Sequence, residues 1–237
     1  MAQPPVRVPK DDARAARQAK AAARRDSIRR AERRRKVLVG SLVVVVVLAV
    51  TAGVAGVVIA ASRPRVVALP DPVAASGTSM PPWAVPVNTS DRIRTAGLST
   101  SAMTPGGAHF HPHLDIRVNG KSVPVAANIG VDAAAGTMSE LHTHDASGIV
   151  HIESAAKDDR YVLGQLFSEW NVRLDRTHLG GLTADSSRSL VAYVDGKRFD
   201  GDPARIELLA HRQIALLFGS RDQQVNPPST YSFPAGE

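Results

Sequence analysis

The sequence predicts an α+β protein in which an N-terminal transmembrane helix precedes a compact extracytoplasmic domain of several β-hairpins around one helix. Three observations support this prediction. Residues 37–61 carry no charge, short alternating segments within 106–220 are separated by Asn-Gly and Asp-Gly turn signals, and one apolar repeat of helical spacing lies among them. Several short strands around a single helix are typical of the α+β class.

The first 61 residues predict a membrane anchor. Residues 1–36 contain 13 Lys/Arg and four Asp/Glu, whereas the net charge of the whole chain is only +7. A helix needs about 20 apolar residues to cross a bilayer, and a signal peptide has an apolar stretch of only roughly 7–15 residues. Residues 37–61 are therefore expected to form an uncleaved, single-pass helix in contact with the lipid bilayer.

The positive charge next to this segment predicts its orientation. Because Lys/Arg-rich flanks stay in the cytoplasm, the basic tail 1–36 is expected to be cytoplasmic and the C-terminal domain extracytoplasmic, at the cell membrane. Since the excess charge lies in a tail and not on a folded module, the composition argues against nucleic acid as a partner.

The rest of the chain divides by composition into three segments. Residues 62–105 are rich in Pro, Ser and Thr and are expected to form a spacer, with a short helix at 90–99 capped by Ser90 or Asp91. Residues 106–220 form the predicted domain and 221–237 a C-terminal tail. The chain has no cysteine, which excludes disulfides and thiolate ligands in this domain.

Turn signals and periodicity predict the elements of the domain. Asn-Gly and Asp-Gly between alternating apolar residues are strong hairpin signals, and apolar residues three and four apart indicate a helix. We expect hairpins at 113–126 (turn at Asn119-Gly120), 141–154 (turn at Asp145–Gly148) and 189–199 (turn at Asp195-Gly196), a helix within 161–172 preceded by the cap candidates Asp158 and Asp159, and strands at Ile206–Leu209 and Ile214–Phe218.

Six of the eight histidines fall into two clusters. In the first, His109, His111 and His113 alternate with other residues, so an extended backbone would direct all three rings to one face. In the second, a turn centred on Ala146-Ser147 pairs His142 with His151, and His144 points the same way. Directly opposed side chains in a hairpin have Cβ atoms about 4.5–5.5 Å apart, so both clusters are expected to reach a common centre.

Neutral imidazole is a good ligand for zinc and copper. The sequence therefore predicts a zinc or copper site formed by His142, His144 and His151 with help from His109, His111 and His113. Further ligands or supporting groups are expected from residues near the clusters: Asp115, Glu140, Asp145, Glu153, Met103 and Met138. The alternative interpretation of the same residues is a polar or pH-sensitive surface.

The segments HFHPHLDIRVNGKSVPV, LHTHDASGIVHIES, YVLGQLFSEWNVRL and AYVDGKRFDGDPARIELLAHRQIALLFG occur in this order within 92–219. In these segments the chain resembles an uncharacterised family of bacterial membrane-tethered or exported proteins with an HxHxH … LHTHDxSGxxHIES domain. The resemblance implies an extracytoplasmic location. It does not indicate whether the domain is an enzyme.

The patterns support three hypotheses about function. The first is a membrane-anchored domain that binds zinc or copper for sequestration, delivery or structural stabilisation. The second is a non-catalytic interaction module of a cell-envelope assembly, with an envelope protein as partner. The third, a metal-dependent enzyme, needs an open coordination position; no catalytic residue is identified, and a non-enzymatic role is preferred.

Overall fold

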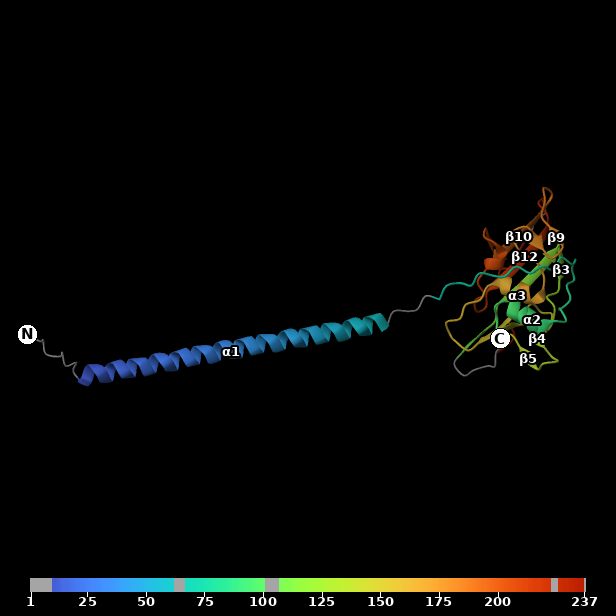
Figure 1. Cartoon of the computed structure of the whole chain (residues 1–237). Helices are drawn as coiled ribbons and strands as arrows, with labels where there is room; N and C mark the ends of the chain where they lie inside the picture. Colours follow the sequence, from blue (N-terminus) through green and yellow to red (C-terminus); the bar gives the residue numbers. More distant parts are fainter. Residues whose placement is uncertain (1–9, 62–66, 101–106, 223–225, 237) are drawn as a thin grey trace, which may run out of the picture. The chain divides into compact units, whose positions relative to one another are not determined.

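The computed structural model describes residues 10–61, 67–100, 107–222 and 226–236, and it divides the chain into two units, 1–65 and 66–237. The described part of the first unit is a single helix, α1 (Lys10–Ala61), of 52 residues (Figure 1). Its first part is rich in Ala, Arg and Lys, which are good helix formers, and its second part is rich in Val. The second unit contains all of the strands and the remaining helices.

The structure confirms that 37–61 is helical, as part of α1. In the parts of the chain that are described, no helix meets the length and apolarity needed to cross a membrane. The predicted transmembrane span at 37–61 is therefore not supported. The cellular location and orientation that were inferred from it stay predictions.

The largest element of the second unit is a five-stranded sheet with the strand order β11-β10-β12-β2-β3. Its strands are β2 (His113–Val118), β3 (Lys121–Val123), β10 (Arg188–Val194), β11 (Lys197–Phe199) and β12 (Gln213–Ser220). β12 pairs with β2 in parallel, and the other neighbours are antiparallel.

Two predicted hairpins are confirmed within this sheet. Asn119 and Gly120 join β2 to β3, and Asp195 and Gly196 join β10 to β11. All four residues have positive φ, between 50° and 79°. Two successive residues with positive φ form the tight turn that matches the twist of a hairpin, which explains why these pairs predicted it correctly.

A second sheet has three short strands in the order β1-β7-β6: β1 (Ala108–Phe110), β6 (Leu141–His142) and β7 (His151–Ser154). The predicted pairing of His142 with His151 is confirmed. Two further small hairpins complete the strands: β4 (Val131–Asp132) with β5 (Thr137–Met138), and β8 (His178–Leu179) with β9 (Leu182–Thr183).

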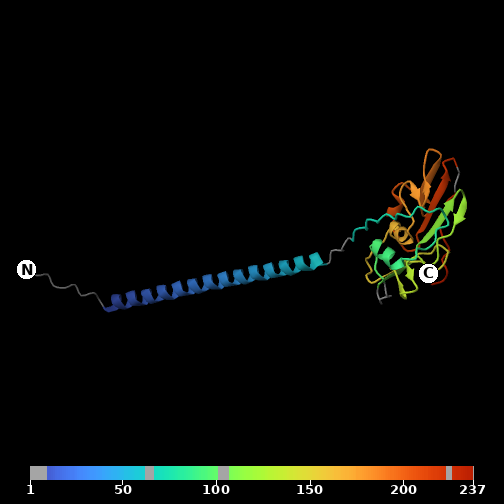
Figure 2. The same ribbon diagram turned by 45° about the vertical axis from the view of Figure 1, so that its right-hand side comes forward.

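The helix α3 (Leu163–Trp170) confirms the predicted helix and lies in the centre of the second unit (Figure 2). All eight of its residues are buried. It begins at Val162, whose N–H donates to the side-chain oxygen of Gln165 at 3.1 Å. The expected acidic caps Asp158 and Asp159 lie too far upstream to act, so that detail of the prediction is wrong.

The segment expected to be a spacer is part of the fold. The short helix α2 (Thr89–Thr95) begins after Asn88 and has no side-chain cap, which corrects the cap expected at Ser90 or Asp91. Ile93 and Trp83 are 2% and 4% exposed, and the rings of Trp83 and Trp170 meet edge to face, 5.6 Å apart. Residues 67–100 therefore cover α3 and contribute to the hydrophobic core.

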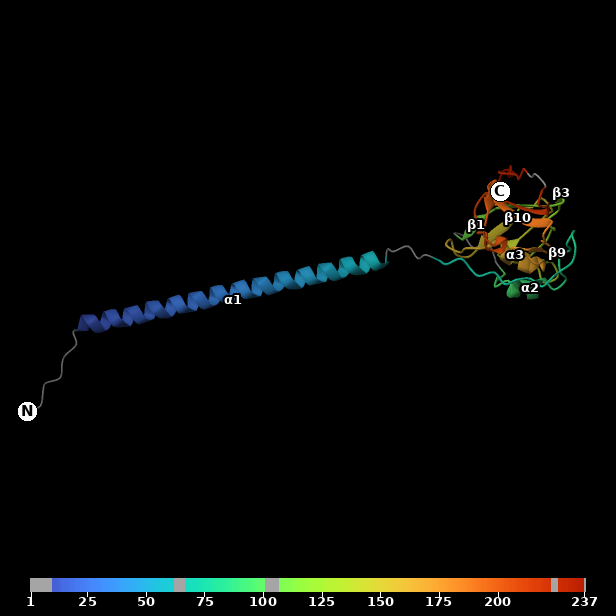
Figure 3. The same ribbon diagram turned by 90° about the horizontal axis from the view of Figure 1, so that it is seen from above.

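The chain around 206–209 differs from its prediction. The residues before it form the 3-10 helix η1 (Pro203–Arg205), and only Glu207 makes an isolated bridge, to Val162. No strand forms there, because η1 and this segment pack on α3, whereas β12 continues the sheet. Figure 3 shows α2 and the C-terminal residues on opposite sides of the unit.

Candidate metal centre

Three histidines form a row across the three-stranded sheet. β7 is the central strand, and its first residue, His151, pairs directly with His142 of β6. On the other side β1 pairs with β7 in the register His109 with Glu153 and Phe110 with Ile152, which places His111 next to His151. The ring centroids of His111 and His142 are 4.5 and 5.3 Å from that of His151.

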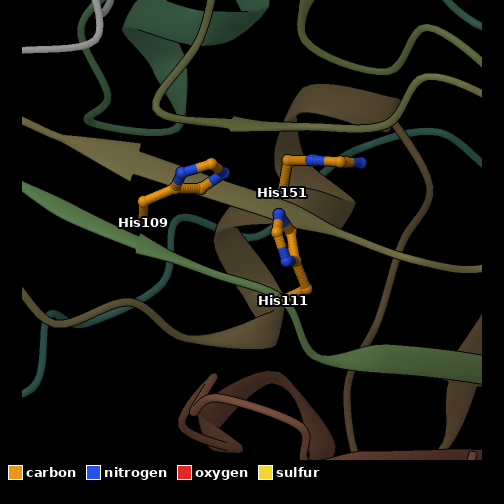
Figure 4. A group of neighbouring side chains, drawn as sticks. All are labelled: His109, His111 and His151. Atoms are coloured by element: carbon orange, nitrogen blue, oxygen red, sulfur yellow. The ribbon is translucent and has the colours of Figure 1, made fainter. Parts of the chain in front are cut away.

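Two more histidines flank the row at the surface. His109 and His144 lie two residues from His111 and His142, at opposite ends of the row, and both are exposed. The structure thus contains two groups that could hold a metal ion, His109/His111/His151 and His142/His144/His151, each with one ligand nitrogen per residue and with these atoms within 4.8 Å of one another. Figure 4 shows the rings of His109 and His111 turned toward that of His151.

The spacing of the nitrogens is slightly larger than in a closed site. Two nitrogens bound to zinc at 2.0–2.1 Å in a tetrahedral array are about 3.3 Å apart. The nitrogens of each group lie within 4.8 Å of one another, and the exposed side chains of His109 and His144 have room to rotate toward the buried ones. The buried His111, His142 and His151 are already fixed by packing.

His142 is oriented as a ligand by the chain itself. Its Nδ1–H donates to the backbone oxygen of Ser139 at 2.9 Å, and this places the lone pair on Nε2. Nε2 is buried and has no hydrogen-bond partner among the described residues. Metal-bound histidines almost always use the other ring nitrogen to donate to a carbonyl or carboxylate. His142 already has this arrangement, with Nε2 available to bind a metal ion.

Burial keeps the central imidazoles neutral. It lowers the pKa of His151 to about 4, with further lowering by the neighbouring His111, His144, His142 and His109. Burial also lowers the pKa of His142, partly opposed by its hydrogen bond to Ser139. A neutral imidazole offers a lone pair, so these two residues are competent ligands at neutral pH.

His113 does not join the cluster, in contrast to the prediction. Pro112 separates β1 from β2, and the chain passes there from the small sheet to the large one. The ring of His113 lies 2.8 Å from the side-chain oxygen of Gln213 and 2.9 Å from the backbone oxygen of Ser147, and it stacks on Tyr231 at 3.7 Å. The alternation HFHPH predicted one face for three rings, but only two share it.

Of the carboxylates expected nearby, Glu153 lies at the cluster, with Oε1 3.6 Å from Nε2 of His109. Asp145 accepts from the N–H of Ser147 in the turn and is also within electrostatic reach of His151 and His144, whereas Asp115 pairs with Arg117. Glu140 accepts from the N–H of Ser99. Met138 belongs to the β4–β5 hairpin, and Met103 lies outside the described residues.

A buried carboxyl behind His142 was not found from the sequence. Glu169 of α3 is 2% exposed, and neither of its oxygens makes a hydrogen bond of ordinary geometry. Burial raises the pKa of Glu169 to about 8; Ser139 and Arg92 oppose this, and Glu140 adds to it. A Cβ on Gly130 would lie 3.0 Å from the Cβ of Ser139 and 3.1 Å from Oε2 of Glu169. The carboxyl therefore packs against the residue whose carbonyl orients His142.

The two isolated histidines lie elsewhere. His178 is 2.9 Å from a carboxylate oxygen of Asp175, and the ring of His211 is 4.7 Å from that of Phe233. Among the residues that the structure describes, neither belongs to a group that could hold a metal.

Comparison with protein families, with curated proteins and with solved structures gave no match. The resemblance noted in the sequence therefore stays a prediction, and the proposals below rest on the geometry of this chain.

Proposed function

We propose that this protein binds a transition metal ion, zinc or copper, through His142, His144 and His151, with His109 and His111 as additional ligands on the other side of His151. The observation that supports this most is the buried lone pair on Nε2 of His142, whose Nδ1–H is held by the Ser139 carbonyl. The donor set consists of imidazole nitrogens, which suits both metals.

The proposed role is to stabilise the fold around the ion. The strands of the small sheet are only three, two and four residues long, and the chain has no cysteine to link them. An ion in the His142/His144/His151 group would join β6 to β7, and one in the His109/His111/His151 group would join β1 to β7. A ligand that binds only the folded state stabilises it by about 2.7 kcal/mol at 100 times its Kd.

The test is calorimetric titration of the full chain with Zn²⁺ and, separately, Cu²⁺ at pH 7.5. A four-ligand structural zinc site provides about 10–16 kcal/mol in total, or about 3 kcal/mol per ligand, so each lost ligand is expected to weaken binding by about 100-fold. His151→Ala removes the residue shared by both groups and is expected to show the largest loss. His142→Ala is expected to show the next largest.

His178→Ala is the matched control, because it removes a histidine outside the cluster. It is expected to bind like the natural chain. If His151→Ala folds and binds either metal as tightly as the His178→Ala control, the proposal is wrong.

A further inference from the structure

The outer face of the five-stranded sheet, opposite the core, contains a cavity of about 580 Å³. Residues Val191 of β10, Leu217 of β12 and Arg117 of β2 are neighbours across three strands and point to this face. Tyr193 lies one step further along β10, next to Arg198 of β11. Most of the exposed surface of this cavity is polar, and Leu217, which is only 6% exposed, contributes little to it.

The rim of this cavity is positively charged. Four arginines from four separate segments line it, and no carboxylate is among the lining residues: Arg117, Arg176, Arg198 and Arg221. We call this site the arginine cavity. Small-molecule sites have volumes of roughly 300–1,000 Å³, and the arginine cavity falls within this range.

Two of the four charges are compensated by neighbouring aspartates. Arg117 pairs with Asp115 at 2.9 Å, and Arg198 pairs with Asp200 at 3.1 Å. Both aspartates lie beside the cavity and do not line it. These pairs hold the guanidinium groups in place without filling the cavity with negative charge.

The other two arginines are held by backbone carbonyls. Arg221 donates from Nε and Nη2 to the oxygen of Asp185, at 3.1 and 2.9 Å, and Arg176 donates to the oxygen of Asp200 at 3.2 Å. A carbonyl orders a guanidinium group but does not neutralise it. The two groups are thus partly fixed before any ligand binds, which reduces the entropy lost on binding.

We propose that the arginine cavity binds a small organic polyanion that carries two or more phosphate or carboxylate groups. The planar guanidinium group binds such groups with two parallel hydrogen bonds. Arginines on several sides of the cavity match anionic groups at the ends of a ligand, and the mostly polar surface between them, with Tyr193, matches a short, hydroxyl-bearing frame. This site is separate from the histidine cluster and does not depend on it.

The proposal is tested by calorimetric titration of the full chain, in metal-free buffer of low ionic strength, with fructose 1,6-bisphosphate, citrate and uncharged fructose. We expect one of the two anions to bind with a Kd below about 1 mM and fructose not to bind. Because a hydrogen bond to a charged group contributes about 1.5–3 kcal/mol, Arg117→Ala/Arg221→Ala is expected to weaken binding at least tenfold.

The control removes the same charge from outside the cavity. Arg94 and Arg205 pair with Asp91 and Asp71 and do not line the cavity, so Arg94→Ala/Arg205→Ala is expected to weaken binding less than threefold. If the first variant fails to fold, Arg176→Ala/Arg198→Ala, which changes two exposed residues, replaces it with the same expectation. Absence of binding of both anions, or an equal loss in the control, overturns the proposal.

Discussion

The substitution Glu169→Gln is expected to change how stability depends on pH. Glu169 is buried in α3, and burial raises the pKa of its carboxyl from 4.5 to about 8. Below pH 4.5 the group is protonated in both states. Between pH 4.5 and 8 the unfolded chain releases the proton and the folded chain retains it, so the free energy of unfolding falls as the pH rises.

The size of this effect follows from the shift. One pH unit corresponds to 1.36 kcal/mol, so the carboxyl is expected to cost the folded state roughly 3–6 kcal/mol above pH 8. Glutamine has nearly the same shape and does not titrate. The variant is therefore expected to be more stable than the natural chain at pH 8 and to differ little from it at pH 4.5.

Urea unfolding at a series of pH values, in the presence of a chelator, measures the difference. Both tryptophans of the chain, Trp83 and Trp170, are buried in the second unit, so their fluorescence reports its unfolding. Glu32→Gln, on the exposed surface of α1, is the control and should leave the profile unchanged. A constant difference between Glu169→Gln and the natural chain from pH 4.5 to 8 would refute the reasoning.

Three further predictions concern the cluster and its surroundings. The pKa of His151 is lowered from 6.5 to about 4. The free energy of unfolding of the metal-free chain should therefore fall by at most about 3 kcal/mol as the pH falls through this range. In the same urea assay, His151→Asn should remove this loss. His113→Ala removes contacts with Gln213 and Tyr231 and should lower the free energy of unfolding by about 2–3 kcal/mol. The zinc affinity measured by calorimetry should change less than threefold; a tenfold change would show that His113 is a ligand after all. Gly148→Ala places a Cβ 2.3 Å from the backbone oxygen of Leu114 at a φ of +93°, so the free energy of unfolding measured with urea should fall by more than about 2 kcal/mol; an unchanged midpoint would contradict this.

Local patterns predicted the hairpins and the centre of the site. The Asn119-Gly120 and Asp195-Gly196 turns were identified because only a few residue types adopt two successive positive φ angles at low cost. The pairing of His142 with His151 followed from counting outward from a turn, since side chains in a strand alternate with a period of exactly two. Each of these inferences needs only residues that are close in the sequence.

Features that depend on distant segments were not predicted. The position of His113 depends on the passage of the chain to a second sheet at Pro112 and on contacts with Gln213 and Tyr231, about 100 residues away. Glu169 lies within an apolar helical repeat, and only the fold shows that it is buried near Gly130 and Arg92 of α2. For a similar reason the expected spacer at 62–105 did not anticipate that residues 67–100 pack on the domain, because proline-rich composition does not reveal that Trp83 packs on Trp170.

The burial that keeps His142 and His151 neutral also explains why the Glu169 carboxyl destabilises the folded state at high pH. The two histidines and Glu169 lie where the small sheet packs near α3. The low polarity of that region disfavours the charged form of each side chain. For an imidazole this removes the proton and exposes a lone pair; for a carboxyl it retains the proton and keeps the group neutral. In the metal-free chain the two effects act on opposite sides of neutrality, so stability declines toward acid through His151 and toward base through Glu169. A metal ion that binds the neutral imidazoles competes with protons for them, so it adds stability at neutral pH that is lost toward acid; it steepens the first decline and leaves the second unchanged, which separates the contribution of the ion from that of the fold around it.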